Sequence, residues 1–256
     1  MINLRTRIAK VREHALQERL RVTHVNRMRA ALAAEFRRVA ERLSRADATQ
    51  REHMITEHEA HLQRILRMTY GTIFRDFGAR VLAQIEKSMR TEQEYKDKLD
   101  DEYAATARRF ITKWSDKRSG EISRTTSNKL DSIISRGAAD GLSEDEIAAN
   151  ITDEIGGAFG SNRALTIART ETHSASQDAM FETVQDTGLN VVKEWVSVAD
   201  DRTREDHVAA NGQVQDMDKP FEVGDDELLY PGDPSGLPEQ IINCRCITVY
   251  NPVAPG

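Results

Sequence analysis

The chain has 256 residues, with 36 lysines and arginines against 42 aspartates and glutamates, and a mean hydropathy of −0.59. This length accommodates one large or two modest domains with a buried core. Apolar runs stay short of the roughly eighteen residues that span a bilayer, and the N-terminal stretch lacks an apolar signal region, so we expect no membrane segment and no cleavable secretion signal.

Charge is distributed unevenly along the chain. Residues 1–47 contain twelve basic and five acidic side chains, whereas residues 151–256 contain seven basic and nineteen acidic ones. The basic N-terminal segment predicts contact with an anionic partner, either nucleic acid or an acidic protein; a solvated helix face is an equally good interpretation. The arginines that would make this contact are Arg5, Arg12, Arg19, Arg27, Arg37 and Arg38. Aromatic residues do not alternate with them, which disfavours stacking on single-stranded bases.

Long helices are predicted for the first half of the chain. The first glycine is Gly71, and apolar residues recur every three or four positions from Leu4 to Leu43, Val11 and Val22 included. A turn follows at residues 44–48, where Asp47 can cap the next helix with Gln50 at the capping-box distance. The second helical pattern runs to Trp114, and it is continuous or broken near Gly71, Gly78 or Met89–Glu92.

Three histidines lie in this second pattern. His58 and His61 are one turn apart and could share a metal ion, and His53 is close to them in sequence. Histidines in a charged helix are more often surface or boundary residues, so we interpret all three in that way.

Shorter helices are predicted after Gly120. The first ends at Gly137, and Ser143 with Glu146 forms a capping box for the next. Three glycines between residues 156 and 160 lack the Gly-Lys-Ser/Thr ending of a phosphate-binding loop, so we interpret them as a hinge.

The last hundred residues mix helix and strand. A helix capped by Ser161 or Asn162 is expected to stop at Gly188. The alternating stretch 191–198 predicts a strand, Asn211-Gly212 a hairpin, and residues 241–250 the final strand. The predicted fold is therefore mainly α with a C-terminal α+β domain, divided into long helices (1–119), short helices with a glycine-rich hinge (120–158) and the mixed domain (159–256).

Residues with distinctive chemistry are concentrated near the C-terminus. His207 lies four residues after Thr203, so a short helix capped by Asp201 or Thr203 would place both on one face. A strand through Cys244-Arg245-Cys246 would point both thiols to the same side. Cysteines this close rarely form a disulfide with each other, and two cysteines provide no disulfide framework, which indicates a reducing compartment.

Ten residues of this part of the chain stand in a distinctive order. They are Arg169, Glu171, Trp195, Asp201, Arg202, Arg204, His207, Asn243, Cys244 and Cys246. The set resembles the phage Mu protein F-like family of head morphogenesis (minor head) proteins over about residues 160–250. Many members carry a His-Pro pair where this chain has Ile241-Ile242. The resemblance implies that these ten residues are a structural core rather than a catalytic site.

The resemblance implies a structural protein of a tailed phage that is made in the host cytoplasm and resides in the virion, inside the capsid near the portal vertex. There it would assist head assembly, DNA packaging or DNA delivery. The portal protein is the implied partner, with scaffold protein, major capsid protein and double-stranded DNA as further candidates. No enzyme activity is expected.

Two other interpretations of the same residues stay open. A hydrolase or transferase could use Glu171 or Asp201 as base, His207 as acid/base, and Arg202 or Arg204 to bind phosphate.

Alternatively, His207, Cys244 and Cys246 could bind zinc, with His173 or Asp201 as the fourth ligand. The single residue between the cysteines is shorter than the usual spacing, so we expect no cofactor and interpret both thiols as packed side chains.

Overall fold

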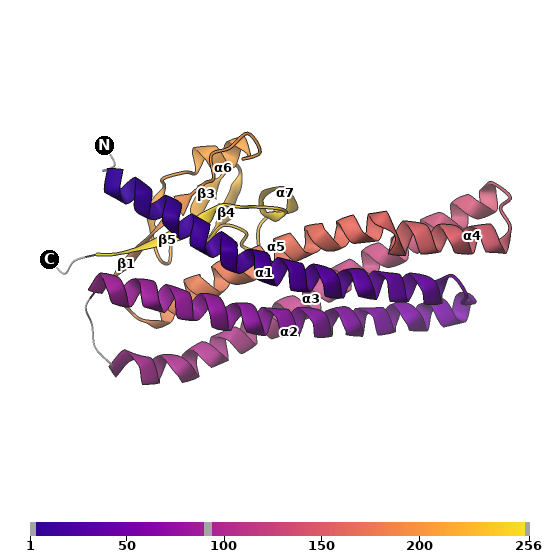
Figure 1. Cartoon of the computed structure of the whole chain (residues 1–256), viewed down its shortest axis with the longest axis horizontal. Helices are drawn as coiled ribbons and strands as arrows, with labels where there is room; N and C mark the ends of the chain where they lie inside the picture. Colours follow the sequence, from indigo (N-terminus) through magenta and orange to yellow (C-terminus); the bar gives the residue numbers. More distant parts are fainter. Residues whose placement is uncertain (1–3, 90–93, 254–256) are drawn as a thin grey trace. The chain divides into compact units, whose positions relative to one another are not determined.

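The computed structural model describes residues 4–89 and 94–253, with side chains described for residues 9–85 and 104–253 (Figure 1). The helices are α1 (Leu4–Leu43), α2 (Ala48–Met89), α3 (Glu94–Ala139), α4 (Glu144–Ile151), the π-helical turn η1 (Thr152–Gly156), α5 (Ala158–Asp186), α6 (Glu205–Ala209) and α7 (Pro238–Ile241). The strands are β1 (Val191–Val196), β2 (Val214–Asp216), β3 (Phe221–Val223), β4 (Asp226–Leu228) and β5 (Ile247–Pro252). The predicted fold class, mainly α with a C-terminal α+β region, is confirmed. No described helix is long and apolar enough to span a membrane.

The chain forms two compact units, each assembled from separate stretches. Unit 1 comprises Met1–His24, Gly71–Arg108 and Arg169–Gly256, and unit 2 comprises Val25–Tyr70 and Arg109–Ala168. The long helices supply segments to both, because a 40-residue helix such as α1 extends about 60 Å. The sequence division at residues 119 and 158 stays a prediction.

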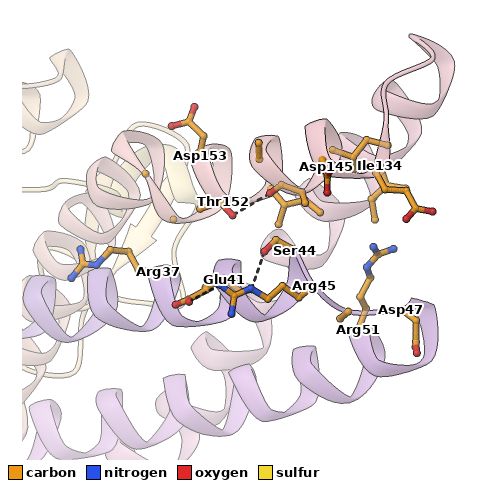
Figure 2. A pocket seen from close by; sticks show the side chains of 18 residues that line it. Arg37, Glu41, Ser44, Arg45, Asp47, Arg51, Ile134, Asp145, Thr152 and Asp153 are labelled. Carbon is orange, nitrogen blue, oxygen red and sulfur yellow. Dashed lines mark hydrogen bonds and ion pairs between the residues drawn. The ribbon is translucent and has the colours of Figure 1, made fainter.

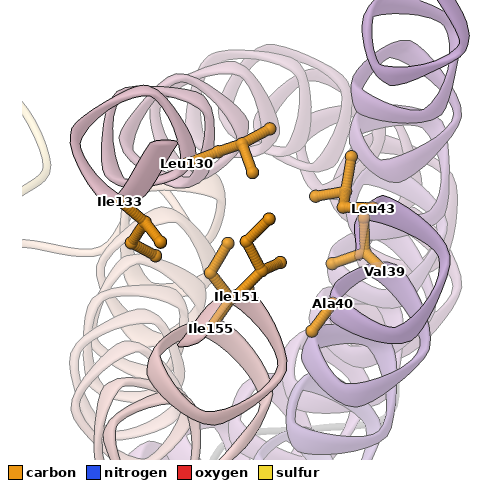
Figure 3. Close-up of a cluster of buried hydrophobic side chains, with 7 residues drawn as sticks. All are labelled: Val39, Ala40, Leu43, Leu130, Ile133, Ile151 and Ile155. Carbon is orange, nitrogen blue, oxygen red and sulfur yellow. The ribbon is translucent and has the colours of Figure 1, made fainter. Parts of the chain in front are cut away.

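Unit 2 is a helical assembly around an aliphatic core. Figure 3 shows the cluster, to which α1, α3, α4 and η1 contribute Val39, Ala40, Leu43, Leu130, Ile133, Ile151 and Ile155. Both predicted capping boxes are confirmed: the Asp47 N–H donates to Gln50 Oε1, the Gln50 N–H donates to Asp47 Oδ1, and Ser143 caps α4 reciprocally with Glu146.

Two predictions for unit 2 are wrong. Helix α3 continues through Gly120 to Ala139. The burial of neighbouring residues on one face of the helix compensates for the low helix propensity of a single glycine. Helix α5 begins at Ala158, so neither Ser161 nor Asn162 caps it.

Glycines in unit 2 permit close backbone approach, and no hinge is needed to explain them. A Cβ atom on Gly156 would lie 3.0 Å from the Ala40 Cβ and 3.3 Å from the Arg37 Cα, both in α1. A Cβ atom on Gly160 would lie 2.1 Å from the backbone oxygen of Ile155.

Glu35 organises a buried polar cluster in unit 2. Its carboxylate accepts two hydrogen bonds of 2.7 Å from Arg38, one of 2.8 Å from His58 Nδ1 and one of 3.2 Å from His61 Nδ1. His58 is fully buried, which corrects the surface interpretation, whereas His53 is exposed and His61 is half-buried. A carboxylate partner makes this burial tolerable for His58.

Unit 1 contains a three-stranded antiparallel sheet with the order β2-β1-β5, and a β3–β4 hairpin. The hairpin turns at Gly224-Asp225, which sequence reasoning missed; Gly224 has a φ of 63°. Asn211-Gly212 instead ends α6 and leads into β2. The final strand spans Ile247–Pro252, because residues 238–241 form α7 and not strand.

The buried face of α1 in unit 1 is polar. Gln17, Arg21 and His24 are buried, whereas Val11 and Val22 are 65% and 47% exposed, so the predicted core positions are wrong there. Helix α5 explains why polar rather than apolar residues of α1 are buried, because residues 170–181 of α5 are all buried and mostly polar. For example, the Gln177 amide donates to Gln17 Oε1 at 3.0 Å and accepts the Thr248 N–H at 2.9 Å.

Candidate functional site

The turn at residues 200–203 and helix α6 place His207. Asp200 Oδ1 accepts the Arg202 N–H at 3.2 Å and the Thr203 hydroxyl at 3.0 Å, which forms a closed turn before the helix. The N-cap of α6 is therefore Arg204, and neither Asp201 nor Thr203 is the cap. The Arg204 guanidinium donates to the carbonyl of Ile242, and Asp201 and Arg202 are exposed.

Asp200 is the central acid of this turn. Both of its oxygens accept 2.6 Å hydrogen bonds from Arg245, which lies between the two cysteines in sequence. The hydrogen bonds from Arg245 hold the pKa of Asp200 well below its usual value. The pair ties the turn before α6 to the segment before β5.

Cys244 and Cys246 face His207 from a turn that precedes β5. Sγ of Cys246 lies 3.3 Å from His207 Nδ1, and Sγ of Cys244 lies 3.7 Å from the same atom. Asn243 makes this approach possible, because it adopts a left-handed conformation (φ 56°) after α7 and donates its N–H to Thr170 Oγ1 at 3.1 Å. Both thiols point inward although the triplet is not in a strand, and Arg245 points toward Asp200.

Gln240 orients the imidazole of His207. The Nε2–H of His207 donates to Gln240 Oε1 at 3.1 Å, and the Gln240 amide donates to Asp206 Oδ2 at 2.7 Å. Gly224 leaves room for this pair, since a Cβ atom there would lie 2.6 Å from Asp206 Oδ2. Because Nε2 carries the proton, Nδ1 presents a lone pair to the two sulfurs.

His173 of α5 adjoins the cysteines from the other side. It is 1% exposed, and it interacts with Cys244 through its side chain. Its Nδ1 contacts the buried guanidinium of Arg21, which Glu18 neutralises at 2.7 Å. Burial lowers the pKa of His173, so the ring is neutral at pH 7.

The two thiols differ in acidity. Burial raises the pKa of Cys244, but interactions with the side chains of Cys246, His173 and His207 outweigh this effect and leave it well below the usual value. The hydrogen bond with Cys244, together with burial, raises the pKa of Cys246.

Comparison with known proteins identifies the region that holds this cluster. Residues 128–249 match the family described as phage Mu protein F like protein. This region is Mu F-like. The match begins in α3, N-terminal to the region of about residues 160–250 in which the motif residues resemble the family. It supports phage head morphogenesis as the protein's context.

One curated relative matches a similar length of chain. An NAD(+)–arginine ADP-ribosyltransferase, EFV, of Enterococcus faecalis is 32% identical over 125 residues, which is 48% of this chain and 25% of the relative. The chain thus spans about a quarter of that relative's length. No solved structure matches significantly.

The remaining motif residues of the Mu F-like region lie at different depths. Trp195 is fully buried, and its ring meets those of His207 and Phe221 edge-on at 5.5 and 5.4 Å. Glu171 is buried in α5, whereas Arg169 is exposed.

Lys193 is a buried cation that sequence reasoning missed. It is 0% exposed, its Nζ donates to the carbonyls of Met217 and Leu229 at 3.1 and 2.8 Å, and it lies over the rings of Phe181 and Phe221. Burial lowers its pKa to about 8. The one sequence signal for its burial was the alternation in β1, which places Lys193 on the same side of the strand as Val191 and Trp195.

The arginines of α1 also differ. Arg12, Arg19, Arg27 and Arg37 are exposed, Arg38 is half-buried against Glu35, and the side chain of Arg5 lies outside the described residues. Four of the six predicted anion-contact residues are thus accessible.

The charged pocket of unit 2, shown in Figure 2, is lined by residues between 37 and 157, apart in the sequence from His207, Cys244 and Cys246. Arg37, Glu41, Arg45 and Asp153 are among the side chains that line it, and Glu41 pairs with Arg45 at 3.1 Å. Among the described residues that line it there is no histidine or cysteine. It offers mixed charge and no pairing of a nucleophile with a histidine base.

Proposed function

We propose that this protein is a minor head protein of a tailed phage, located inside the capsid at the portal vertex, where it assists head assembly, DNA packaging or DNA delivery. The observation that carries the proposal is the match of residues 128–249 to the phage Mu protein F-like family. A long-helix segment attached to this region would dock on the portal protein.

The geometry of the motif residues favours a structural role over the hydrolase or transferase alternative. His207, the acid/base of that alternative, is 2% exposed, whereas Asp201 and Arg202 are exposed. A substrate that contacts these two residues would not reach the imidazole. The relative named as a transferase extends far beyond the matched quarter, so we expect the chain, incubated with NAD⁺ and host protein, to transfer no ADP-ribose. Transfer above the level of a heat-denatured sample would support the alternative.

The exposed apolar side chains of α1 are the docking residues that we propose for the portal. Val11 and Val22 are 65% and 47% exposed and lie three helical turns apart, hence on one face. A deletion of the predicted long-helix region, residues 1–119, would not test this docking face. The deletion would also remove α1 and α2 from the cores of both units. Surface substitutions avoid that difficulty.

The test is co-expression with the portal protein of the same phage, followed by size-exclusion chromatography. We expect the wild-type chain to co-elute with the portal ring, and the double variant Val11→Glu/Val22→Glu to elute alone. Met68→Glu is the matched control, because Met68 is 70% exposed on α2 and its variant should still co-elute. Absence of a wild-type complex would overturn the portal assignment, and co-elution of the double variant would overturn docking through this face.

The exposed arginines of α1 are proposed to contact double-stranded DNA. Replacing Arg12, Arg19, Arg27 and Arg37 with Gln should weaken binding and reduce the slope of log K against log salt by up to about 3.6, since each lost phosphate contact removes about 0.9.

A control with the same charge change replaces four exposed arginines of α2 and α3, namely Arg64, Arg75, Arg108 and Arg124. An equal loss of DNA binding in this control would show that the α1 arginines are not a distinct DNA-binding surface. Absence of wild-type binding would assign the basic face to an acidic protein.

A further inference from the structure

The imidazole of His207 and the thiols of Cys244 and Cys246 meet in the interior of unit 1. The ligand atoms of His207, Cys244 and Cys246 all lie within 4.8 Å of one another, and none of these residues is more than 5% exposed. We propose that His207, Cys244 and Cys246 bind a structural Zn²⁺ ion, with His173 as the fourth ligand. This site is independent of the proposed portal contact.

The distances fit a tetrahedral zinc ion. With Zn–S bonds of about 2.3 Å and Zn–N bonds of about 2.0 Å, the nitrogen and sulfur ligands of a tetrahedral site are about 3.5 Å apart. Nδ1 of His207 lies 3.3 Å from one sulfur and 3.7 Å from the other. One metal position can therefore reach all three ligand atoms with little movement.

The hydrogen bonds around His207 fix its tautomer and ring orientation in the way that metal-binding histidines require. Metal-binding histidines usually donate their other ring N–H to an oxygen, which fixes the tautomer and the ring orientation. Gln240 Oε1 accepts that proton at 3.1 Å, and Asp206 fixes the Gln240 amide at 2.7 Å. The Nδ1 lone pair is thus aimed at the sulfurs before any metal arrives.

His173 is the residue best placed to complete the site. Its ring interacts with Cys244, and its Nε2 has no hydrogen-bond partner among the described residues. Arg21 donates to Nδ1 in this structure, so the neutral ring carries its proton on Nε2. Ligation through Nε2 therefore requires that the proton moves to Nδ1 and that Arg21 turns from the ring to Glu18, which it already contacts at 2.7 Å. Because buried polar atoms are nearly always satisfied, the unpartnered Nε2 is the atom of this ring that is open to a ligand once the tautomer has changed. Asp201, the other candidate from the sequence, is exposed and is not a ligand.

The charge balance also suits zinc. Two thiolates neutralise the ion, and Glu18 already neutralises Arg21 at 2.7 Å, so the buried cluster would carry no net charge. Two sulfur and two imidazole ligands in tetrahedral geometry are characteristic of zinc. The zinc ion would join three parts of unit 1, namely α6, the segment before β5 and helix α5.

Elemental analysis of the full-length chain tests the site directly. The protein is expressed with added zinc and purified under reducing conditions without chelator. We expect one zinc per chain, and X-ray absorption with two sulfur ligands at about 2.3 Å and two nitrogen ligands at about 2.0 Å. Less than one-tenth zinc per chain, with no rise in Tm when ZnCl₂ is added, would overturn the proposal.

Variants locate the ligands. Cys246→Ser and His207→Asn should purify without zinc, and His173→Asn should lower zinc affinity at least about 10-fold in competition with a chromophoric chelator. His53→Asn is the control, because His53 is exposed in unit 2 and its variant should keep full zinc content. Wild-type affinity in His173→Asn would overturn the fourth ligand.

If the ligand variants fail to fold, the site is tested by adding Co²⁺ to the folded, metal-free wild-type chain and recording its absorption spectrum. A thiolate-to-cobalt charge-transfer band supports the site, and its absence refutes it.

Discussion

Glu35 is the residue whose loss we expect to cost unit 2 the most stability. Burial alone would raise the pKa of its carboxyl, but hydrogen bonds from His58 and Arg38 dominate and lower the pKa from 4.5 to about 2. A group with a lowered pKa in the folded state stabilises the protein above its unfolded pKa, and this contribution is lost as the pH falls toward 2. The shift corresponds to about 3 kcal/mol.

The perturbation is Glu35→Gln, measured by urea denaturation between pH 7 and pH 2.5. At pH 7 we expect the free energy of unfolding to fall by about 3 kcal/mol. The gap between wild type and variant should narrow below pH 4.5, because Glu35 then becomes protonated in the unfolded chain while the folded carboxylate stays ionised down to about pH 2. Glu41→Gln is the control, since Glu41 is exposed in α1 and its pair with Arg45 should contribute less than about 0.5 kcal/mol. A pH-independent gap would refute the electrostatic reasoning.

Three further substitutions test individual contacts by chemical denaturation. Asn243→Ala should destabilise by about 1 kcal/mol, because alanine tolerates the left-handed backbone poorly. Lys193→Met should abolish a rise in stability of about 3 kcal/mol between pH 8 and 10.5: the wild-type lysine is neutral when folded and charged when unfolded in that window, so the unfolded state binds more protons. Gly160→Ala should destabilise by about 2 kcal/mol, because its Cβ would lie 2.1 Å from a backbone oxygen.

Each of these substitutions has a matched control. Asn243→Gly should be close to neutral, since glycine adopts the same conformation, and equal losses in both variants would contradict the backbone explanation. Lys219→Met removes an exposed lysine and should keep the alkaline rise. Gly120→Ala should stabilise by about 0.5–1 kcal/mol, because the nearest atom to its Cβ is a side-chain oxygen at 3.7 Å. The same sign for both glycines would refute the steric argument.

Local signals in the sequence predicted the helices well. The Asp47 and Ser143 caps and the stop at Gly188 are interactions between residues a few positions apart, so the sequence contains all that is needed. Periodicity failed for Val11 and Val22, because it assumes an apolar interior, and the interior of unit 1 at α1 is a polar network with α5. That network joins Gln17 to Gln177, which are 160 positions apart.

The candidate site was predictable in membership but not in arrangement. Residue type and order indicated His207, Cys244 and Cys246, and the structure brings them together. The partners of Asp200, Gln240 and Lys193 could not be predicted, because each partner lies 24 to 45 positions away in the sequence. Their roles follow from tertiary contacts that residue type alone does not reveal.

The proposed position at the portal vertex is tested most directly by quantitative mass spectrometry of purified procapsids. Procapsids are prepared from the parent phage and from a mutant that assembles shells without portal protein. We predict that the protein is present in the first preparation in a small, fixed ratio to portal subunits, and absent from the second. Equal amounts in both preparations, or absence from the first, would contradict the account.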